Sequence, residues 1–268
     1  DLHSFPTRRS SDLHIDGIDL DDAADATAAS ITSTTGGVQL RARDNIGTVT
    51  DVRTRQGTPI AINTNGGALS AQVGSAAGQI NLNIASGSNP TAAAAAISAG
   101  GAGRLLIQSP GDLSLNSFNA AIAGFSEVGF SADGTLQVSG RQSDLIAGPL
   151  TTLLLRGGND IAQADRVFEL SANQLVFESG GQGGNVTLNT NVDLLDATIG
   201  NGASLTVVEG GDITLGSITA GGDVSIRAAN IFDDGDVNAV TRITAGNSLS
   251  LQGSAGIGRA DEIGRAHV

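Results

Sequence analysis

The chain lacks five residue types altogether: cysteine, methionine, tryptophan, tyrosine and lysine. Without cysteine there are no disulfides and no thiolate-ligated metal sites, although this does not fix the compartment. Between residues 14 and 261 the only histidine is His14. A serine nucleophile therefore has no histidine or lysine base within reach, and a zinc site has no set of imidazole ligands. The core has to be built from valine, leucine, isoleucine and alanine, with seven phenylalanines.

Positive charge and long apolar runs are also scarce. Fourteen arginines face 27 acidic residues, which gives a formal charge of −13. Nucleic acids and anionic membranes both require a basic surface, so neither is expected as a partner. No apolar run is long enough to cross a bilayer as a helix. With 40% hydrophobic residues in 268, the chain can still bury a large core.

Both ends of the chain resemble translated sequencing-library adapters. The absence of methionine already indicates a processed chain or a fragment. Residues 262–268 and the core of residues 1–13, Ser4–Asp12, carry the adapter resemblance. We therefore expect two non-native, adapter-derived tails, 1–13 and 262–268, around a native segment of residues 14–261. Natural polar tails are the alternative.

One short phrase, aliphatic–hydroxyl–aliphatic, occurs four times between Gly184 and Leu251. The copies are Val186–Leu188, Leu205–Val207, Val224–Ile226 and Leu249–Leu251, and the polar residues before them are Asn185, Ser204, Asp223 and Ser248. The flanking sequence Ile218–Gly221 also returns as Ile243–Gly246, at the same offset as the last two copies. Self-similarity at a period of roughly 20–30 residues is typical of a solenoid, in which each repeat is one coil.

The amino-terminal half has a similar rhythm. Here the repeated unit is a triplet with aliphatic residues at its first and third positions, and its central residue varies. The copies are Val38–Leu40, Ile60–Ile62, Ile80–Leu82 and Leu105–Ile107, and they follow one another at offsets in the same range. Further strand candidates are residues 68–73, 113–115 and 136–138, each bounded by turn-forming residues. Residues 88–99, with Pro90 and an alanine run, predict an outward loop or one helical turn. Residues 118–130 and 142–149 do not follow the repeat pattern, and the sequence does not assign them to a coil register.

These patterns predict an all-β fold, a right-handed parallel β-helix with coils of about 19–25 residues and about eleven coils in total. Side chains alternate faces along a strand, so each phrase places two aliphatic residues inward and its hydroxyl outward. The preceding polar residues are expected to stack at a corner and to cap backbone groups there. An antiparallel sandwich or hairpin array, the competing fold, would show no fixed offset.

Residues 218–226, followed by residues 229–236, resemble the repeats of large secreted bacterial surface proteins. The family is that of the filamentous-haemagglutinin-like, two-partner-secretion adhesins and related β-strand-repeat proteins, whose recurrent Ile-Gly corner resembles residues 42–47 and 254–258. The resemblance covers most of residues 36–261, but the family's secretion domain is not visible. It implies a β-helical shaft of an extracellular or cell-surface protein, with a host or cell-surface receptor and an outer-membrane transporter as partners.

The sequence offers little chemistry. We expect no catalytic, cofactor-binding or metal-binding residue. The one weak calcium candidate is the cluster Asp233, Asp234 and Asp236, for which an acidic turn between coils is the preferred interpretation. Residues 157–160, ending at Asp160, echo a calcium-binding nonapeptide that requires tandem copies, and only one is present.

Two functions are considered. The first is a non-catalytic structural or adhesive shaft, supported by an unbroken Thr/Ser/Asn outer face. The alternative is a carbohydrate-active β-helix enzyme, a polysaccharide lyase or hydrolase. Carboxylates and arginines on adjacent coils beneath an overhanging loop would favour the enzyme.

Overall fold

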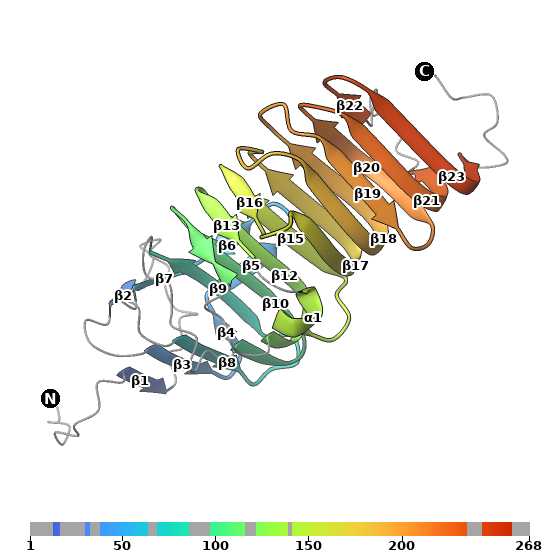
Figure 1. Ribbon diagram of the computed structural model, residues 1–268. Coiled ribbons are helices and arrows are strands. Elements are labelled where there is room, and N and C mark those ends of the chain that lie inside the picture. Colours follow the sequence, from blue (N-terminus) through green and yellow to red (C-terminus); the bar gives the residue numbers. More distant parts are fainter. Residues whose placement is uncertain are drawn as a thin grey trace, which may run out of the picture.

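The computed structural model in Figure 1 describes residues 13–16, 30–32, 38–63, 69–85, 97–115, 122–138, 141–234 and 243–258. The chain winds into a parallel β-solenoid of about seven turns, with β1 and β23 at opposite ends of the stack. Within these residues the only helix is the single turn α1 (Gln142–Leu145). The predicted all-β solenoid is confirmed. Some coils of the amino-terminal half are longer than the predicted 19–25 residues, since Val38 pairs with Leu69 and Asn45 with Gln79.

The main sheet contains eighteen strands: β1 (Leu13–Asp16), β2 (Ser30–Thr32), β3 (Val38–Ala42), β4 (Asn45–Ile46), β7 (Ile60–Asn63), β8 (Leu69–Val73), β9 (Gln79–Ile84), β10 (Ile97–Ser109), β12 (Ile122–Ala132), β14 (Ile146–Ala147), β15 (Thr152–Gly157), β17 (Val167–Ser179), β18 (Val186–Ile199), β19 (Leu205–Glu209), β20 (Ile213–Ala220), β21 (Val224–Asp233), β22 (Ile243–Ala245) and β23 (Leu249–Ile257). A three-stranded parallel sheet contains β11 (Leu113–Ser114), β13 (Thr135–Gln137) and β16 (Asp160–Ala162). An antiparallel hairpin is formed by β5 (Thr48–Asp51) and β6 (Gln56–Thr58).

The four repeated phrases of the carboxy-terminal half stack in the predicted register. Val186 pairs with Leu205, Leu205 with Val224, and Val224 with Leu249. The central hydroxyl residues, Thr187, Thr206, Ser225 and Ser250, form their own ladder, and none of them is buried. The flanking repeat is confirmed as well, since Ile218 pairs with Ile243.

The predicted corner ladder is also present. Asn185 Oδ1 accepts the backbone N–H of Ser204 at 2.9 Å, and Ser204 Oγ accepts that of Asp223 at 2.9 Å. Asp223 Oδ1 accepts the backbone N–H of Ser248 at 3.0 Å and its hydroxyl at 2.7 Å. Each polar side chain thus caps the equivalent residue of the next coil, which pins the register at the turn where the aliphatic phrase begins.

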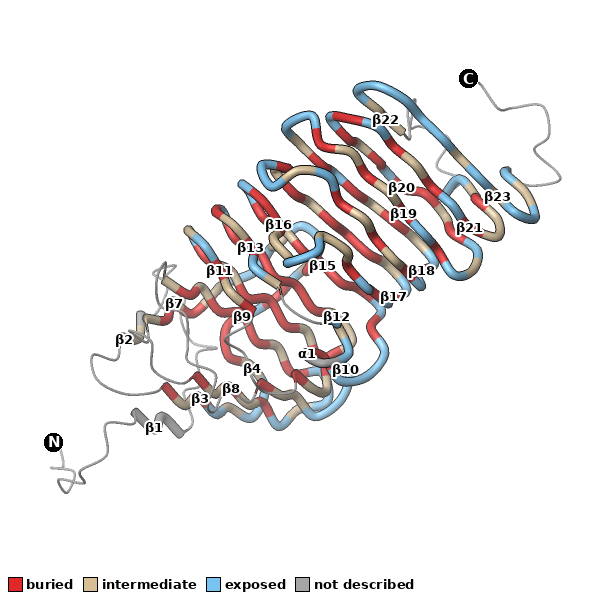
Figure 2. Tube along the Cα trace, in the orientation of Figure 1, coloured by how far each residue is buried: buried red, intermediate tan, exposed pale blue. Residues whose placement is uncertain are grey.

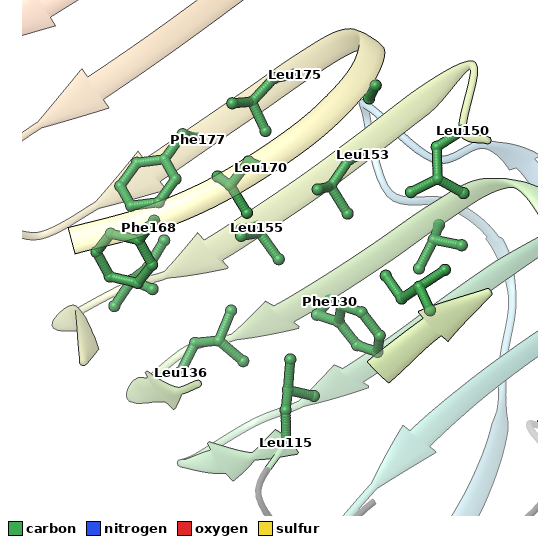
Figure 3. Close-up of a cluster of buried hydrophobic side chains, with 14 of the residues drawn as sticks. Leu115, Phe130, Leu136, Leu150, Leu153, Leu155, Phe168, Leu170, Leu175 and Phe177 are labelled. Atoms are coloured by element: carbon green, nitrogen blue, oxygen red, sulfur yellow. The ribbon is translucent and has the colours of Figure 1, made fainter. Parts of the chain in front are cut away.

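Two inward ladders build much of the core, and burial alternates along the strands as Figure 2 shows. The first ladder is Ile46, Ile80, Leu105, Val128, Leu153, Leu175, Leu195 and Leu215. The second is Leu82, Ile107, Phe130, Leu155, Phe177, Ala197, Ile218 and Ile243. Near the middle of the stack Phe168 and Phe177 meet edge to face, with ring centroids 5.2 Å apart (Figure 3). These rings fill the interior as the aliphatic residues do elsewhere.

The predicted register of the amino-terminal half is partly wrong. Ile80 does pair with Leu105, as expected. Val38, however, pairs with Leu69 rather than Ile60, and Ile60 pairs with Leu82 rather than Ile80. The physical reason is the β5–β6 hairpin, which inserts extra residues into this coil and lengthens it.

The passages without an assigned register have different outcomes. Residues 122–130 belong to strand β12, whose pairing with β10 shifts register on both sides of Phe125, whereas residues 142–149 include α1 and the short strand β14. Residues 88–96, which include Pro90, lie outside the described residues, and β10 begins at Ile97. In the described part of the chain no helix is long and apolar enough to cross a membrane.

Candidate functional site

The β5–β6 hairpin is the one antiparallel element of the described chain, and it lies on the outside of the coil stack. Three side chains of the stack hold its first strand. Gln79 Oε1 accepts the N–H of Val49 at 2.7 Å, Asn81 Nδ2 donates to the carbonyl of Thr48 at 2.7 Å, and Arg104 Nη1 donates to the carbonyl of Val49 at 3.5 Å. The hairpin is thus hydrogen-bonded to two successive coils.

Beneath the hairpin the outer face of the solenoid is apolar. Leu106, Gly129, Leu154 and Val176 occupy one outward column, each paired with the next. With Val49 and Val52 of the hairpin segment, the three aliphatic residues of this column form a second buried cluster, separate from the interior core. Gly129 leaves space for the hairpin, because a Cβ there would lie 2.8 Å from Val52 Cγ1. The hairpin therefore covers four successive coils.

This covered column was missed at the sequence level, although a signal for it exists. The phrases Leu105–Ile107, Leu153–Leu155 and Leu175–Phe177 have an aliphatic residue at the centre, where the carboxy-terminal copies have threonine or serine. Because the centre of each phrase points outward, an aliphatic centre indicates that something covers the outer face at that coil.

Charged side chains line the covered column. Arg104 and Glu127 form an ion pair at 3.1 Å between neighbouring coils. Arg156 contacts Asp133 at 2.8 Å and Glu178 at 3.5 Å, and Arg55 of the hairpin segment lies 3.8 Å from the same Glu178 oxygen. Arginines and carboxylates thus alternate on adjacent coils beside the overhanging hairpin. This is the arrangement that would favour a β-helical enzyme.

A cleft of about 230 Å³ lies between the tip of the hairpin and the coil stack. Arg53 and Thr54 contribute the hairpin side, and Glu178, Asp196 and Ser217 the shaft side. Among the described residues, the Arg53 guanidinium has no hydrogen-bond or ion-pair partner, and its side chain is exposed. The cleft is therefore lined by one unpaired cation and two carboxylates.

The two carboxylates lie on neighbouring coils. Val176 pairs with Asp196 and Glu178 with Thr198, so Glu178 and Asp196 are two positions apart in register. Strand geometry then separates their Cα atoms by about 8 Å. Asp196 accepts the backbone N–H of Ser217 at 2.9 Å and the Gln174 amide at 3.2 Å. Paired carboxylates on adjacent coils are what a glycosidase requires, but both carboxylates already have partners here, Glu178 in Arg55 and Arg156 and Asp196 in Gln174 and Ser217.

No family model matches this chain, and neither a curated protein nor a solved structure does. The geometry therefore has to support any functional argument by itself.

The calcium candidate is only partly within the described chain. Asp233 is the last residue of β21 and, like Asp234, is exposed, whereas Asp236 lies outside the described residues. The described ranges contain no group of three residues able to hold a metal ion. A calcium site at Asp233, Asp234 and Asp236 thus stays a prediction.

Two further residues singled out by the sequence have clear positions. Asp160, the end of the nonapeptide echo, is buried and forms a bidentate ion pair with Arg166, at 2.7 Å and 3.0 Å. Its carboxylate is therefore committed to the fold rather than to calcium. His14 lies in β1, and β1 pairs with β3 at the amino-terminal end of the stack.

Proposed function

We propose that this chain is a segment of a non-catalytic structural and adhesive shaft of a large secreted bacterial surface protein. The observation that carries the proposal is the pair of inward ladders, which run through eight strands each and make the molecule a rod. At the usual strand spacing, the eight strands of one ladder alone span roughly 34 Å. On the carboxy-terminal coils the outward hydroxyl ladder presents an uncharged, hydrated surface. In this proposal the parent protein is exported through an outer-membrane transporter and contacts a host or cell-surface receptor.

Attachment to cells tests this proposal. Beads coated with the folded chain are expected to bind cultured epithelial cells more than beads coated with the same chain unfolded by heat. Because the shaft would present its surface only when the coils are stacked, folded and unfolded beads with equal attachment would contradict the adhesive role.

A second function, a carbohydrate-active enzyme, is favoured by one observation. Glu178 and Asp196 lie on adjacent coils beneath the hairpin tip, with Arg53 beside them. In such an enzyme the two carboxylates would serve as general acid and base, and the arginine would bind an acidic sugar.

A panel of neutral and acidic polysaccharides separates the two functions. We expect no turnover by the parent chain. Asp193→Asn, on the exposed surface of β18, is the control. Turnover that is kept in this control but lost in Asp196→Asn and Glu178→Gln would support the enzyme function and contradict the non-catalytic shaft.

A further inference from the structure

A second hollow, away from the hairpin, lies beside α1 and has a volume of about 670 Å³. Its wall is formed by Arg141, α1 and residues 146–149, and its floor by the outward side chains of β17, β18 and β19. The volume lies in the ordinary range for a ligand site, about 300–1,000 Å³. We call this hollow the α1 groove.

In the wall of the α1 groove, the side-chain amide of Gln142 forms two hydrogen bonds with the backbone of Ser171. Gln142 Nε2 donates to the carbonyl of Ser171 at 2.8 Å, and Gln142 Oε1 accepts the N–H of Ser171 at 2.8 Å. One amide thus satisfies both polar groups of one residue on β17, as a neighbouring strand would. The groove is therefore lined by side chains that can replace a strand partner.

Two more amides line the floor of the α1 groove without such a partner. Asn189 is half-buried and Asn191 is exposed, and among the described residues neither side chain makes a hydrogen bond. They are two positions apart on β18, so they project from the same face about 6.7 Å apart. An extended peptide presents its N–H and C=O pairs along one edge at this same spacing.

The charged and apolar residues that line the α1 groove indicate which class of ligand it can bind. Arg141 and Glu169 form an ion pair across the groove at 2.8 Å, and the other lining residues of the groove are uncharged, so its lining has no free cation to attract an anionic polymer. Val208 is 41% exposed on the floor and offers a contact for a small aliphatic side chain. An uncharged extended peptide fits these features better than an acidic polysaccharide.

We propose that the α1 groove binds an extended peptide segment of a protein partner, with Asn189 and Asn191 each hydrogen-bonding one peptide unit. The inference rests on the adhesive function proposed above and supplies its ligand class. Asn189 and Asn191 are binding residues in this proposal, and Gln142 holds the wall to β17.

The test begins with a phage-displayed library of random heptapeptides, selected on the intact chain and counter-selected on Asn189→Ala/Asn191→Ala. An enriched peptide, made with blocked termini, is then titrated calorimetrically. N-methylation at two positions separated by one residue is expected to weaken binding about fivefold each, the size of one neutral hydrogen bond, and methylation of the residue between them much less. The double asparagine variant is expected to bind at least tenfold more weakly. Gln137→Ala, which removes an exposed amide on β13, is the matched control and should bind like the parent.

A library that yields no peptide able to distinguish the parent from the double variant would overturn the inference. Losses of affinity on N-methylation that do not alternate along the peptide would also overturn it. Because the two asparagine side chains make no hydrogen bond within the described chain, the double variant should keep the parent's circular dichroism spectrum. Bead attachment separates this inference from the adhesive function. Attachment that persists in the double variant, with no peptide binding by the parent, contradicts only the groove. Peptide binding without any cell attachment contradicts only the adhesive role.

Discussion

At the residue scale, the Arg166 side chain connects three segments of the solenoid. Its guanidinium binds both carboxylate oxygens of Asp160 and also donates to the carbonyls of Gly184 and Asn185, at 3.1 Å and 3.0 Å. Its backbone adopts a positive φ of 56°, which non-glycine residues rarely do. The Asp160 side chain is only 9% exposed and the Arg166 side chain 19%. The ion pair joins β16 to the corner before β17, and the two carbonyl hydrogen bonds join that corner to the one before β18.

Removing one partner of this pair should therefore be costly. Arg166→Ala leaves the Asp160 carboxylate buried without its cation, and we expect a loss of about 3–5 kcal/mol in the free energy of unfolding. Urea denaturation followed by circular dichroism measures it. Adding Asp160→Asn should restore part of the loss, since the buried charge is then gone. A loss below about 1 kcal/mol in the single variant would show that the pair is solvated and weak.

At the element scale, the β5–β6 hairpin makes contacts far along the chain. Val52 is fully buried against the outward column, and Arg55 reaches Glu178. A charge at Val52 should release the hairpin without unstacking the coils, because the interior ladders do not depend on it. For Val52→Asp we expect tryptic cleavage after Arg53 and Arg55 to become roughly tenfold faster or more, as the undocked population rises.

Limited proteolysis with mass spectrometry locates the cuts. Thr54→Ser, at the exposed tip, is the control and should be cleaved at the parent's rate. If Val52→Asp resists trypsin as the parent does, the hairpin is held by its polar contacts and not by the apolar column.

The elements differ in how well the sequence predicts them. The register of β18, β19, β21 and β23 was predictable, because the aliphatic phrases and their capping residues recur together at nearly constant offsets. The amino-terminal register was not predictable, because the hairpin changes the length of its coil. A shift of two residues also keeps every side chain on its expected face, so the pattern of aliphatic residues does not reveal the error. The cleft below the hairpin was also not predictable in detail. Glu178 and Asp196 meet Arg53 only because separate segments fold onto one face.

At the scale of the whole molecule, the last described coil is incompletely covered. Leu249 continues the inward ladder of Val186, Leu205 and Val224, all of which are buried, yet it is 50% exposed, and Ile257 is 56% exposed. A strand at the edge of a sheet can pair with another chain, and exposed aliphatic residues strengthen such pairing. The stack is therefore expected to associate through this end.

Sedimentation velocity over a concentration series tests this expectation. The parent chain should form larger species as concentration rises, and Leu249→Lys/Ile257→Lys should shift it towards the monomer, because a charge at the apolar end opposes stacking. Gln137→Lys, on the exposed side of β13, is the control and should associate like the parent. Equal suppression by the control would indicate a general charge effect instead.

The hairpin also has a consequence for the order in which the chain folds. Coils of a solenoid form from contacts between neighbours, so folding can begin at any coil and spread. Val49 and Val52 cannot complete their packing until the strand carrying Val176 has been added, far later in the chain. Docking of the hairpin is thus a late step of high contact order, and the folding energy of this solenoid is not a sum over adjacent coils.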